Sequence, residues 1–292
     1  MKIALVDGFN LAFRAYYGMP ELARKDGFPT GAIHGWVRTL WWVEDNVQPD
    51  FILVFFDLGG ASRQLAIRED YKANRTEAPE DLEQQIPVIK EWTRAAGYVG
   101  VEEDGVEADD LIAGYAGKLS GEGQEVLIIS ADKDLAQLVT DTVHQLVPPP
   151  TANPKLGWRE LDPEGVVDKF GVSAGQIADY LALIGDTSDN IPGLKGVGPK
   201  TAAKWLNQYK TVEEIINHSG ELNPKRFQGL VYTEADNLRM NLEMTRLDHG
   251  VKIDEAAHAE LDPDRAVALL REMEMERSAE SLLQRQSAAK DT

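Results

Sequence analysis

Short apolar runs alternate with stretches of helical periodicity along the first half of the chain. Short apolar runs lie within residues 2–6, 51–56 and 125–129, which is typical of strands buried on both faces of a parallel sheet. Residues 33–43 and 111–119 instead repeat apolar positions at helical spacing. This alternation predicts an α/β fold with a central, mainly parallel sheet flanked by helices.

The second half of the chain shows helical patterns alone. A proline-rich stretch at residues 148–158 interrupts the α/β alternation, and we interpret it as the connection to a second part. The helices predicted beyond it span residues 173–185, 199–209, 212–217, 232–242 and 263–273. We therefore expect an α/β core over residues 1–158, a helical region over 159–285 and a polar, frayed tail over 286–292.

Each predicted strand is followed by acidic residues. Asp7 follows the first strand, Asp57 the second, and Asp132 and Asp134 the third. Ligands of open parallel sheets bind beyond the carboxyl ends of the strands, so these acids should gather at one edge. With two further acidic segments, the candidate metal ligands are Asp7, Asp57, Glu107, Asp109, Asp110, Asp132, Asp134, Asp186 and Asp189.

This set of acids has the chemistry of a magnesium site. Mg²⁺ prefers carboxylate oxygen, and two ions about 3.5–4 Å apart stabilise both the attacking and the leaving oxygen of a phosphodiester displacement. A single acid at a strand end is often only a turn or cap residue, and acids in the first turn of a helix gain about 0.3–1 kcal/mol without any metal. Several clusters of like charge, however, cost stability unless cations neutralise them, so their conjunction predicts two Mg²⁺ ions, with Mn²⁺ as a substitute.

Composition limits the other possibilities. The chain has no cysteine and five scattered histidines, which excludes a thiolate zinc site and disfavours a histidine-rich one. It has no apolar run long enough for a bilayer, and its start enters a strand-like stretch without a charged leader, so we expect a cytoplasmic protein that does not associate with membranes. A net charge of −19 argues against a general nucleic-acid binder, unless a metal pocket holds the acids and local basic segments face the phosphates.

A glycine-rich turn joins two of the predicted helices, within residues 173–209. Glycines let the backbone approach a phosphate closely, and the amides at the start of the next helix point toward it. The candidate DNA-binding residues here are Gly193, Lys195, Gly196, Gly198, Lys200, Thr201 and Lys204. An ordinary helix connection with a glycine cap is the alternative, but lysines on both sides of the turn favour phosphate binding.

A second basic segment contains Tyr71, Lys72 and Arg75. The two basic side chains are suited to neutralising a scissile phosphate, and the tyrosine to stacking on an unpaired base. Basic residues beside an aromatic residue are equally common on solvated surfaces, so both interpretations stay open for this segment alone.

At these residues the sequence resembles the 5′ nuclease family, which includes flap endonucleases and the N-terminal 5′-3′ exonuclease domain of bacterial DNA polymerase I. The resemblance covers about residues 1–250, and more weakly extends to 285. The motifs that carry it are Val6-Asp7-Gly8, residues 30–35, Phe56-Asp57, residues 71–75, residues 107–110, residues 131–135 and residues 185–202.

The resemblance implies a PIN-like nuclease core, a helical arch over about residues 71–92 and a helix-hairpin-helix element that holds K⁺ against duplex phosphate. It also implies that the nine acids bind two divalent ions, with Asp186 and Asp189 completing the second site. An arginine usually precedes the Tyr-Lys motif in the family, and Arg63 and Arg68 are both candidates for it.

We therefore expect a structure-specific 5′ nuclease that hydrolyses DNA with 5′ flaps, nicks, gaps or 5′ ends during replication and repair. The residues expected to act in catalysis are Lys72, Arg75, Asp7, Asp110 and Asp134. We expect a monomer associated with the nucleoid, working with a DNA polymerase in cis or in trans. The alternatives are an acid-rich PIN-like ribonuclease, which would not need the duplex-gripping turn, and a catalytically silent subunit that binds DNA structures.

Overall fold

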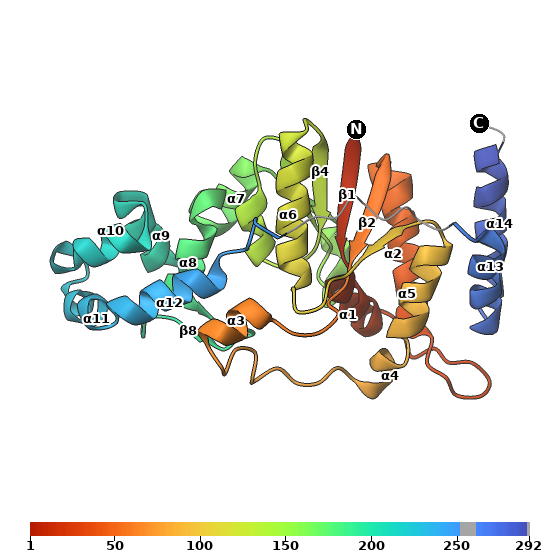
Figure 1. Cartoon of the computed structure of the whole chain (residues 1–292), viewed down its shortest axis with the longest axis horizontal. Coiled ribbons are helices and arrows are strands. Elements are labelled where there is room, and N and C mark those ends of the chain that lie inside the picture. The colour runs from red at the N-terminus through yellow and green to blue at the C-terminus, as the bar shows by residue number, and fades with distance from the viewer. Residues whose placement is uncertain (252–260, 291–292) are drawn as a thin grey trace.

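A computed structural model of the chain describes residues 1–251 and 261–290, and its first part is built on a six-stranded sheet (Figure 1). The order of the strands is β3-β2-β1-β4-β5-β6, and every neighbouring pair is parallel except β5 with β6. The strands are β1 (Lys2–Asp7), β2 (Phe51–Phe55), β3 (Val99–Val101), β4 (Glu125–Ile129), β5 (Val143–Val147) and β6 (Arg159–Leu161). The predicted α/β fold is confirmed, and the three predicted strands form the middle of the sheet.

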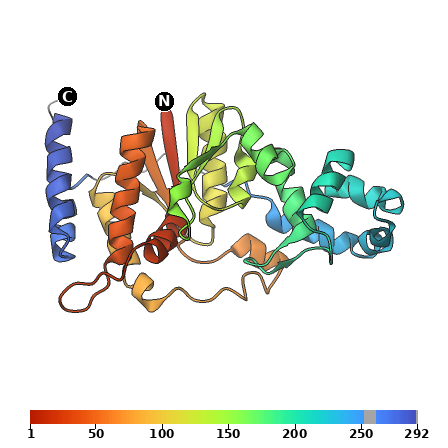
Figure 2. The same ribbon diagram turned by 180° about the vertical axis from the view of Figure 1, so that it is seen from behind.

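Helices cover both faces of this sheet. On β1, Ala4 and Val6 pack in one cluster with α1 (Gly8–Gly18) and α2 (Gly31–Val47), whereas Ile3 and Leu5 pack with α6 (Ala108–Gly121) on the other face. The helix α6 lies in front of the sheet in Figure 1, and α2 comes to the front in Figure 2. Since successive strand residues point to opposite faces, covering both faces requires the unbroken apolar runs seen in the sequence.

A helical region extends from one end of the sheet. Its elements are α7 (Pro163–Phe170), α8 (Ile177–Ile184), β7 (Gly185–Asp186), β8 (Ile191–Pro192), α9 (Pro199–Tyr209), α10 (Val212–Asn217), α11 (Gln228–Thr233) and α12 (Ala235–Thr245). Short 3₁₀ turns lie at η2 (Pro154–Leu156), η3 (Ala174–Gln176), η4 (Ser219–Glu221) and η5 (Lys225–Phe227). Leu181, Trp205 and Leu238 are buried in its own core. None of the helices that the structure describes is both long and apolar enough to cross a membrane.

The limits of the two predicted regions need correction. The strand β6 pairs with β5, so the sheet continues beyond residue 158. At the other end of the chain, α13 (Pro263–Glu272) and α14 (Glu276–Lys290) lie across the molecule from α8–α12, with Leu270 and Leu282 in the same cluster as Trp92. The helices predicted over 159–285 therefore form two groups, and residues 286–290, predicted as a frayed tail, belong to α14.

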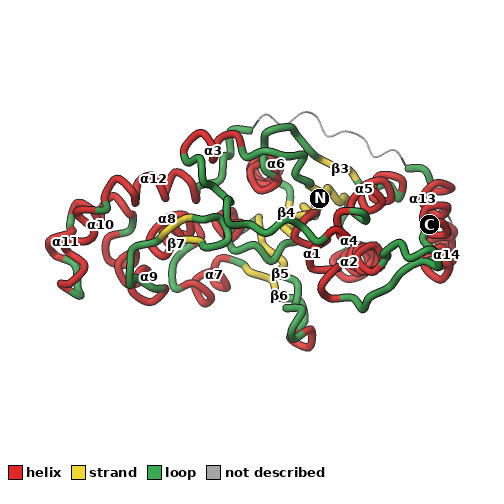
Figure 3. Tube along the Cα trace, turned by 90° about the horizontal axis from the view of Figure 1, so that it is seen from below, coloured by secondary structure: helices red, strands yellow, loops and turns green. Residues whose placement is uncertain are grey.

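The predicted arch over residues 71–92 is only partly separate from the core. Its second half contains α4 (Glu80–Glu83) and the first part of α5 (Ile86–Ala95), whose Ile89 and Trp92 are buried against the sheet layer. The preceding helix α3 (Ser62–Ile67) is joined to α4 by a loop along the lower edge of the molecule in Figure 1, and Figure 3 shows this loop from below. The segment free to arch over a ligand is thus shorter than predicted.

Candidate metal centre and nucleic-acid interface

Asp7 lies at the centre of the carboxyl edge of the sheet. It ends β1 and caps α1, because the amide of Asn10 donates to its Oδ1 at 3.1 Å, while the Ser130 hydroxyl donates to its Oδ2 at 2.7 Å. Burial raises the pKa of Asp7 to about 7, and the charges of Asp132 and Asp57 add to that rise. The structure therefore brings the acids that follow β1, β2 and β4 within electrostatic reach of one another.

The start of α6 adds acids from a fourth segment. Burial raises the pKa of Asp109, as do the charges of Asp132, Asp7 and Asp134. Burial also raises the pKa of Glu107, against the opposing charge of Lys72. All these shifts have one physical cause, the withdrawal of several carboxylates from water into one pocket.

The second group of acids consists of Asp134, Asp186 and Asp189. Each offers a carboxylate oxygen, and these three oxygens lie within 4.8 Å of one another. Burial and the charge of Asp132 raise the pKa of Asp134. Its Oδ1 is buried without a hydrogen-bond partner, and the Nζ of Lys133 approaches it only to 3.9 Å. An oxygen-only set with an unpartnered buried oxygen fits a hard divalent cation.

Basic side chains surround these acids. The Nζ of Lys72 pairs with Glu107, and Nη2 of Arg75 donates to Oδ1 of Asp189 at 2.8 Å. A cavity of about 280 Å³ is lined by Lys72, Arg75 and Glu107, together with Asp57 and other residues. Acidic and basic side chains thus share one site, and a phosphate bound there would contact the basic ones.

Two neighbouring side chains differ from the sequence analysis. Tyr71 is only 8% exposed, and its hydroxyl donates to Glu107 Oε2 at 3.1 Å and to Asp189 Oδ2 at 3.3 Å. Its buried ring therefore offers no face for the base stacking that the sequence analysis had left open. Lys133 was not among the predicted residues, yet its Nζ donates to Asp186 Oδ2 at 2.5 Å. Its position between Asp132 and Asp134 in the sequence could have indicated a place in the site. Its partner Asp186, however, is distant in sequence and could not be predicted.

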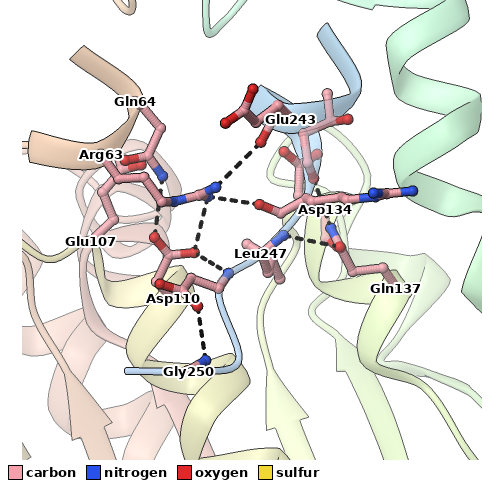
Figure 4. A network of polar contacts seen from close by, with 12 residues as sticks. Arg63, Gln64, Glu107, Asp110, Asp134, Gln137, Glu243, Leu247 and Gly250 are labelled. Carbon is pink, nitrogen blue, oxygen red and sulfur yellow. Dashed lines mark hydrogen bonds and ion pairs between the residues drawn. The ribbon is translucent and has the colours of Figure 1, made fainter. Parts of the chain in front are cut away.

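Asp110 is not brought together with the other acids. It is buried, and its carboxylate accepts hydrogen bonds from Gln64 Nε2 at 3.2 Å and from the amide of Asp248 at 2.8 Å, with Arg63 Nη2 at 3.6 Å (Figure 4). Consecutive helical residues point about 100° apart, so Asp110 cannot share the direction of Asp109. A role for Asp110 as a metal ligand would require it to leave these partners.

The two candidate arginines are held differently. Arg63 donates to the carbonyls of Glu243 and Arg246 and lies beside Asp110, whereas Arg68 pairs with Asp70 at 2.6 Å. Neither guanidinium contacts the acids that gather around Asp7.

The glycine-rich turn lies between β8 and α9. A Cβ on Gly193 would lie 2.2 Å from the carbonyl carbon of Ile184, and Gly196 has a positive φ of 81°, so both positions need glycine. Gly198 is the N-cap of α9, and a Cβ built there would meet no atom within 4 Å. The exposed lysines of the turn and helix are Lys195, Lys200 and Lys204, and none has an ion-pair partner among the described residues. Thr201 lies in the first turn of α9 beside them.

These features define a class of protein, namely an acid-rich α/β nuclease fold joined to a helix-hairpin-helix region. Residues 2–171 match the family model of the 5′-3′ exonuclease N-terminal resolvase-like domain, and residues 172–267 match that of the 5′-3′ exonuclease C-terminal SAM fold. The chain belongs to the 5′-3′ exonuclease family, as its motifs indicated.

Relatives of known name support this assignment. A 5′-3′ exonuclease of Aquifex aeolicus is 42% identical over 214 residues, which are 73% of this chain and 72% of that protein. The thermostable DNA polymerase I of Thermus aquaticus is 36% identical over 94% of this chain but only 32% of its own length. The chain therefore spans about a quarter to a third of the polymerase I relatives that it matches.

Solved structures share the fold. The T5 5′-exonuclease with bound zinc ions has a TM-score of 0.70 at 23% identity, over 97% of this chain and 99% of that chain. The catalytic core of Rad2 in complex with a DNA substrate has a TM-score of 0.62 at 14% identity, over 97% of this chain and 91% of that chain.

Proposed function

We propose that this chain is a 5′ nuclease that hydrolyses phosphodiester bonds of branched or 5′-ended DNA with the help of two divalent ions. The observation that carries the proposal is the trio Asp134, Asp186 and Asp189, whose oxygens converge within 4.8 Å and include the unpartnered Oδ1 of Asp134. An oxygen-only site of this kind suits Mg²⁺, with Mn²⁺ as a substitute.

The acids would form two adjoining sites. Asp7, Asp57, Glu107, Asp109 and Asp132 would hold one ion, and Asp134, Asp186 and Asp189 would hold the other. When bound, such ions supply an activated water and stabilise the leaving oxygen of an in-line displacement. The two sites adjoin because Asp132 and Asp134 follow the same strand, and the amide of Asp134 donates to Asp132 Oδ1 at 2.9 Å.

Lys72 and Arg75 would act on the phosphate itself. Both now pair with carboxylates of the site, Lys72 with Glu107 and Arg75 with Asp189. A phosphate entering the cavity beside them is a competing anionic partner, which the guanidinium can bind with two parallel hydrogen bonds. Their charges would thereby neutralise the negative charge that builds up during displacement.

The glycine-rich turn would hold the duplex beyond the cleavage point. Its backbone approaches a phosphate closely at Gly196 and Gly198, and Lys195, Lys200 and Lys204 supply charge without reading bases. We further propose K⁺ between the carbonyls of this turn and a duplex phosphate. We expect a monomer in the cytoplasm at the nucleoid, cooperating with a DNA polymerase in cis or in trans, since many relatives are longer polymerases.

A flap-cleavage assay tests the proposal. A DNA duplex with a 5′ flap, labelled on the flap strand, is incubated with the protein in Mg²⁺ or in chelator, and products are resolved on a denaturing gel. We expect Mg²⁺-dependent release of the flap near the junction. An RNA flap cut in preference to DNA would favour the ribonuclease alternative, and DNA binding without product in Mg²⁺ or Mn²⁺ would favour the silent subunit.

A further inference from the structure

The helix α12 connects the glycine-rich turn to the nuclease core. Asn241 on this helix donates through Nδ2 to the carbonyl of Ala182 at 3.2 Å and to that of Pro192 at 2.7 Å. Pro192 directly precedes Gly193, the first residue of the turn. Thr245 also donates through Oγ1 to Ala178 on α8 at 2.9 Å. The position of α12 therefore fixes where the turn begins.

Two side chains of the core hold the carboxyl end of α12 (Figure 4). From α3, Arg63 donates through Nη1 to the carbonyl of Glu243 at 3.2 Å and through Nη2 to that of Arg246 at 2.7 Å. From the 3₁₀ turn η1 (Asp134–Leu138), Gln137 donates through Nε2 to the carbonyl of Thr245 at 3.1 Å. Its Oε1 in turn accepts from the amide of Leu247 at 3.1 Å. These four contacts clamp residues 243–247 through the main chain.

The same two side chains contact the segments that carry the acids of the pocket. The Nε2 of Gln137 also donates to the carbonyl of Asp134 at 2.9 Å, so a single amide group joins a candidate metal ligand to the end of α12. On the other side, Arg63 lies 3.6 Å from Asp110, whose carboxylate also accepts from the amide of Asp248. The clamp therefore contacts α12, η1 and α6 at once.

We propose that Arg63 and Gln137 are positioning residues. They set the distance between the glycine-rich turn and the metal-binding acids, and so select which phosphodiester is cut. This inference rests on the proposed nuclease function. Successive phosphates of one strand are about 3.4 Å apart along the duplex axis, so a displacement of that size moves the next phosphate into the site. A displacement of about 1 Å already slows a positioned reaction up to a hundredfold.

Arg63 contacts α12 through main-chain carbonyls, so it is suited to holding the end of this helix in place. Its guanidinium already donates to two carbonyls and lies beside one carboxylate, whereas Arg75 pairs with Asp189 and lines the cavity. Arg277 on α14 is exposed, lies across the molecule from α12 and forms no ion pair among the described residues, which makes it a control.

The test compares Arg63→Ala and Gln137→Ala with Arg277→Ala and Gln284→Ala, which change exposed residues of α14. Each protein cuts the 5′-flapped duplex under single turnover, and products are sized to one nucleotide. For the two clamp variants we expect products at neighbouring positions as well as at the wild-type position, and rates at saturation reduced about 10- to 100-fold. Duplex Kd should change less than about threefold, since no phosphate contact is removed.

Milder substitutions keep the test decisive if an alanine variant does not fold. Arg63→Lys can reach only one of the two carbonyls, and Gln137→Glu keeps the acceptor for Leu247 but loses the donor shared by Asp134 and Thr245. Each should spread the cleavage positions while the circular dichroism spectrum and Tm stay near those of wild type. Cleavage only at the wild-type position in folded variants overturns the clamp, whereas wild-type protein that cuts no substrate overturns the nuclease function itself.

Discussion

The acid pocket and the glycine-rich turn both carry the charges expected of a nucleic-acid enzyme, but they hold them in opposite ways. In the pocket, Asp7 and Asp186 are buried, and the cations Lys72 and Lys133 are paired with acids. On the turn, Lys195, Lys200 and Lys204 are exposed and have no ion-pair partner among the described residues.

This difference separates the part that would catalyse hydrolysis from the part that would bind the duplex. Buried carboxylates of like charge destabilise one another until a cation enters, so the pocket is built to bind ions at fixed positions. Exposed lysines are screened by salt and attract any phosphate, so the turn is built to hold a duplex without reading its sequence. The overall charge of −19 therefore does not describe the glycine-rich turn, whose exposed side chains include three lysines.

The largest expected effect follows from removing one acid of the pocket. Asp134→Ala should lower the single-turnover rate by roughly 10²- to 10³-fold, the loss typical of removing one preorganised electrostatic group. DNA affinity should stay the same or rise, because a negative charge is lost. Asp141→Ala, which changes an exposed acid, is the control and should cleave at the wild-type rate.

Divalent ions should stabilise the fold. An ion at about a hundredfold its Kd adds about 2.7 kcal/mol to the free energy of unfolding, which corresponds to roughly 5–10 °C in Tm at about 2–4 °C per kcal/mol. Thermal scans in MgCl₂ and in NaCl of equal ionic strength separate ion binding from screening. Equal Tm values in the two salts would contradict a built metal site.

Substituting glycines of the turn should test its packing. Gly193→Ala places a methyl group 2.2 Å from the backbone of Ile184 and should cost about 1–3 kcal/mol of stability through overpacking. Gly198→Ala meets no atom within 4 Å and is the matched control. Urea unfolding of both variants measures the difference, and equal losses would show that the close approach at Gly193 is not required.

The smallest effect concerns one lysine of the turn. Lys200→Ala should weaken duplex binding modestly and reduce the slope of log K against log salt by about one. Lys155→Ala, an exposed lysine on η2, should leave that slope unchanged. Duplex-binding titrations at several salt concentrations, from low to moderate, measure these slopes. Identical slopes for the two variants would show that Lys200 does not contact the duplex.

The sequence was sufficient to predict the middle of the sheet and the gathering of acids at its edge. An unbroken apolar run specifies a strand covered on both faces, and an acid directly after it must lie at the carboxyl end, as Asp7 does. The same pattern could not predict β3 (Val99–Val101), because three residues carry too little periodicity and the strand forms by pairing with β2.

Partners distant in sequence were the part that could not be predicted. The motif around Lys72 indicated a basic segment, but not that Tyr71 is buried against Glu107 and Asp189. Likewise, the amphipathic pattern of α13 indicates a buried face without saying that Leu270 packs in the cluster of Trp92. Periodicity reports which face is apolar, and tertiary packing decides what covers it.

The most direct test of this division between catalysis and duplex binding compares Asp134→Ala with a variant in which Lys195, Lys200 and Lys204 are all alanine. Single-turnover cleavage of the 5′-flapped duplex is measured in Mg²⁺ over a range of protein concentrations, which gives both the rate at saturation and the apparent Kd. The lysine variant should bind more weakly yet approach the wild-type rate at saturation, while Asp134→Ala should bind normally and scarcely cleave. A lysine variant with normal affinity and a slow rate at saturation, or an Asp134→Ala protein that cleaves normally, would contradict this account.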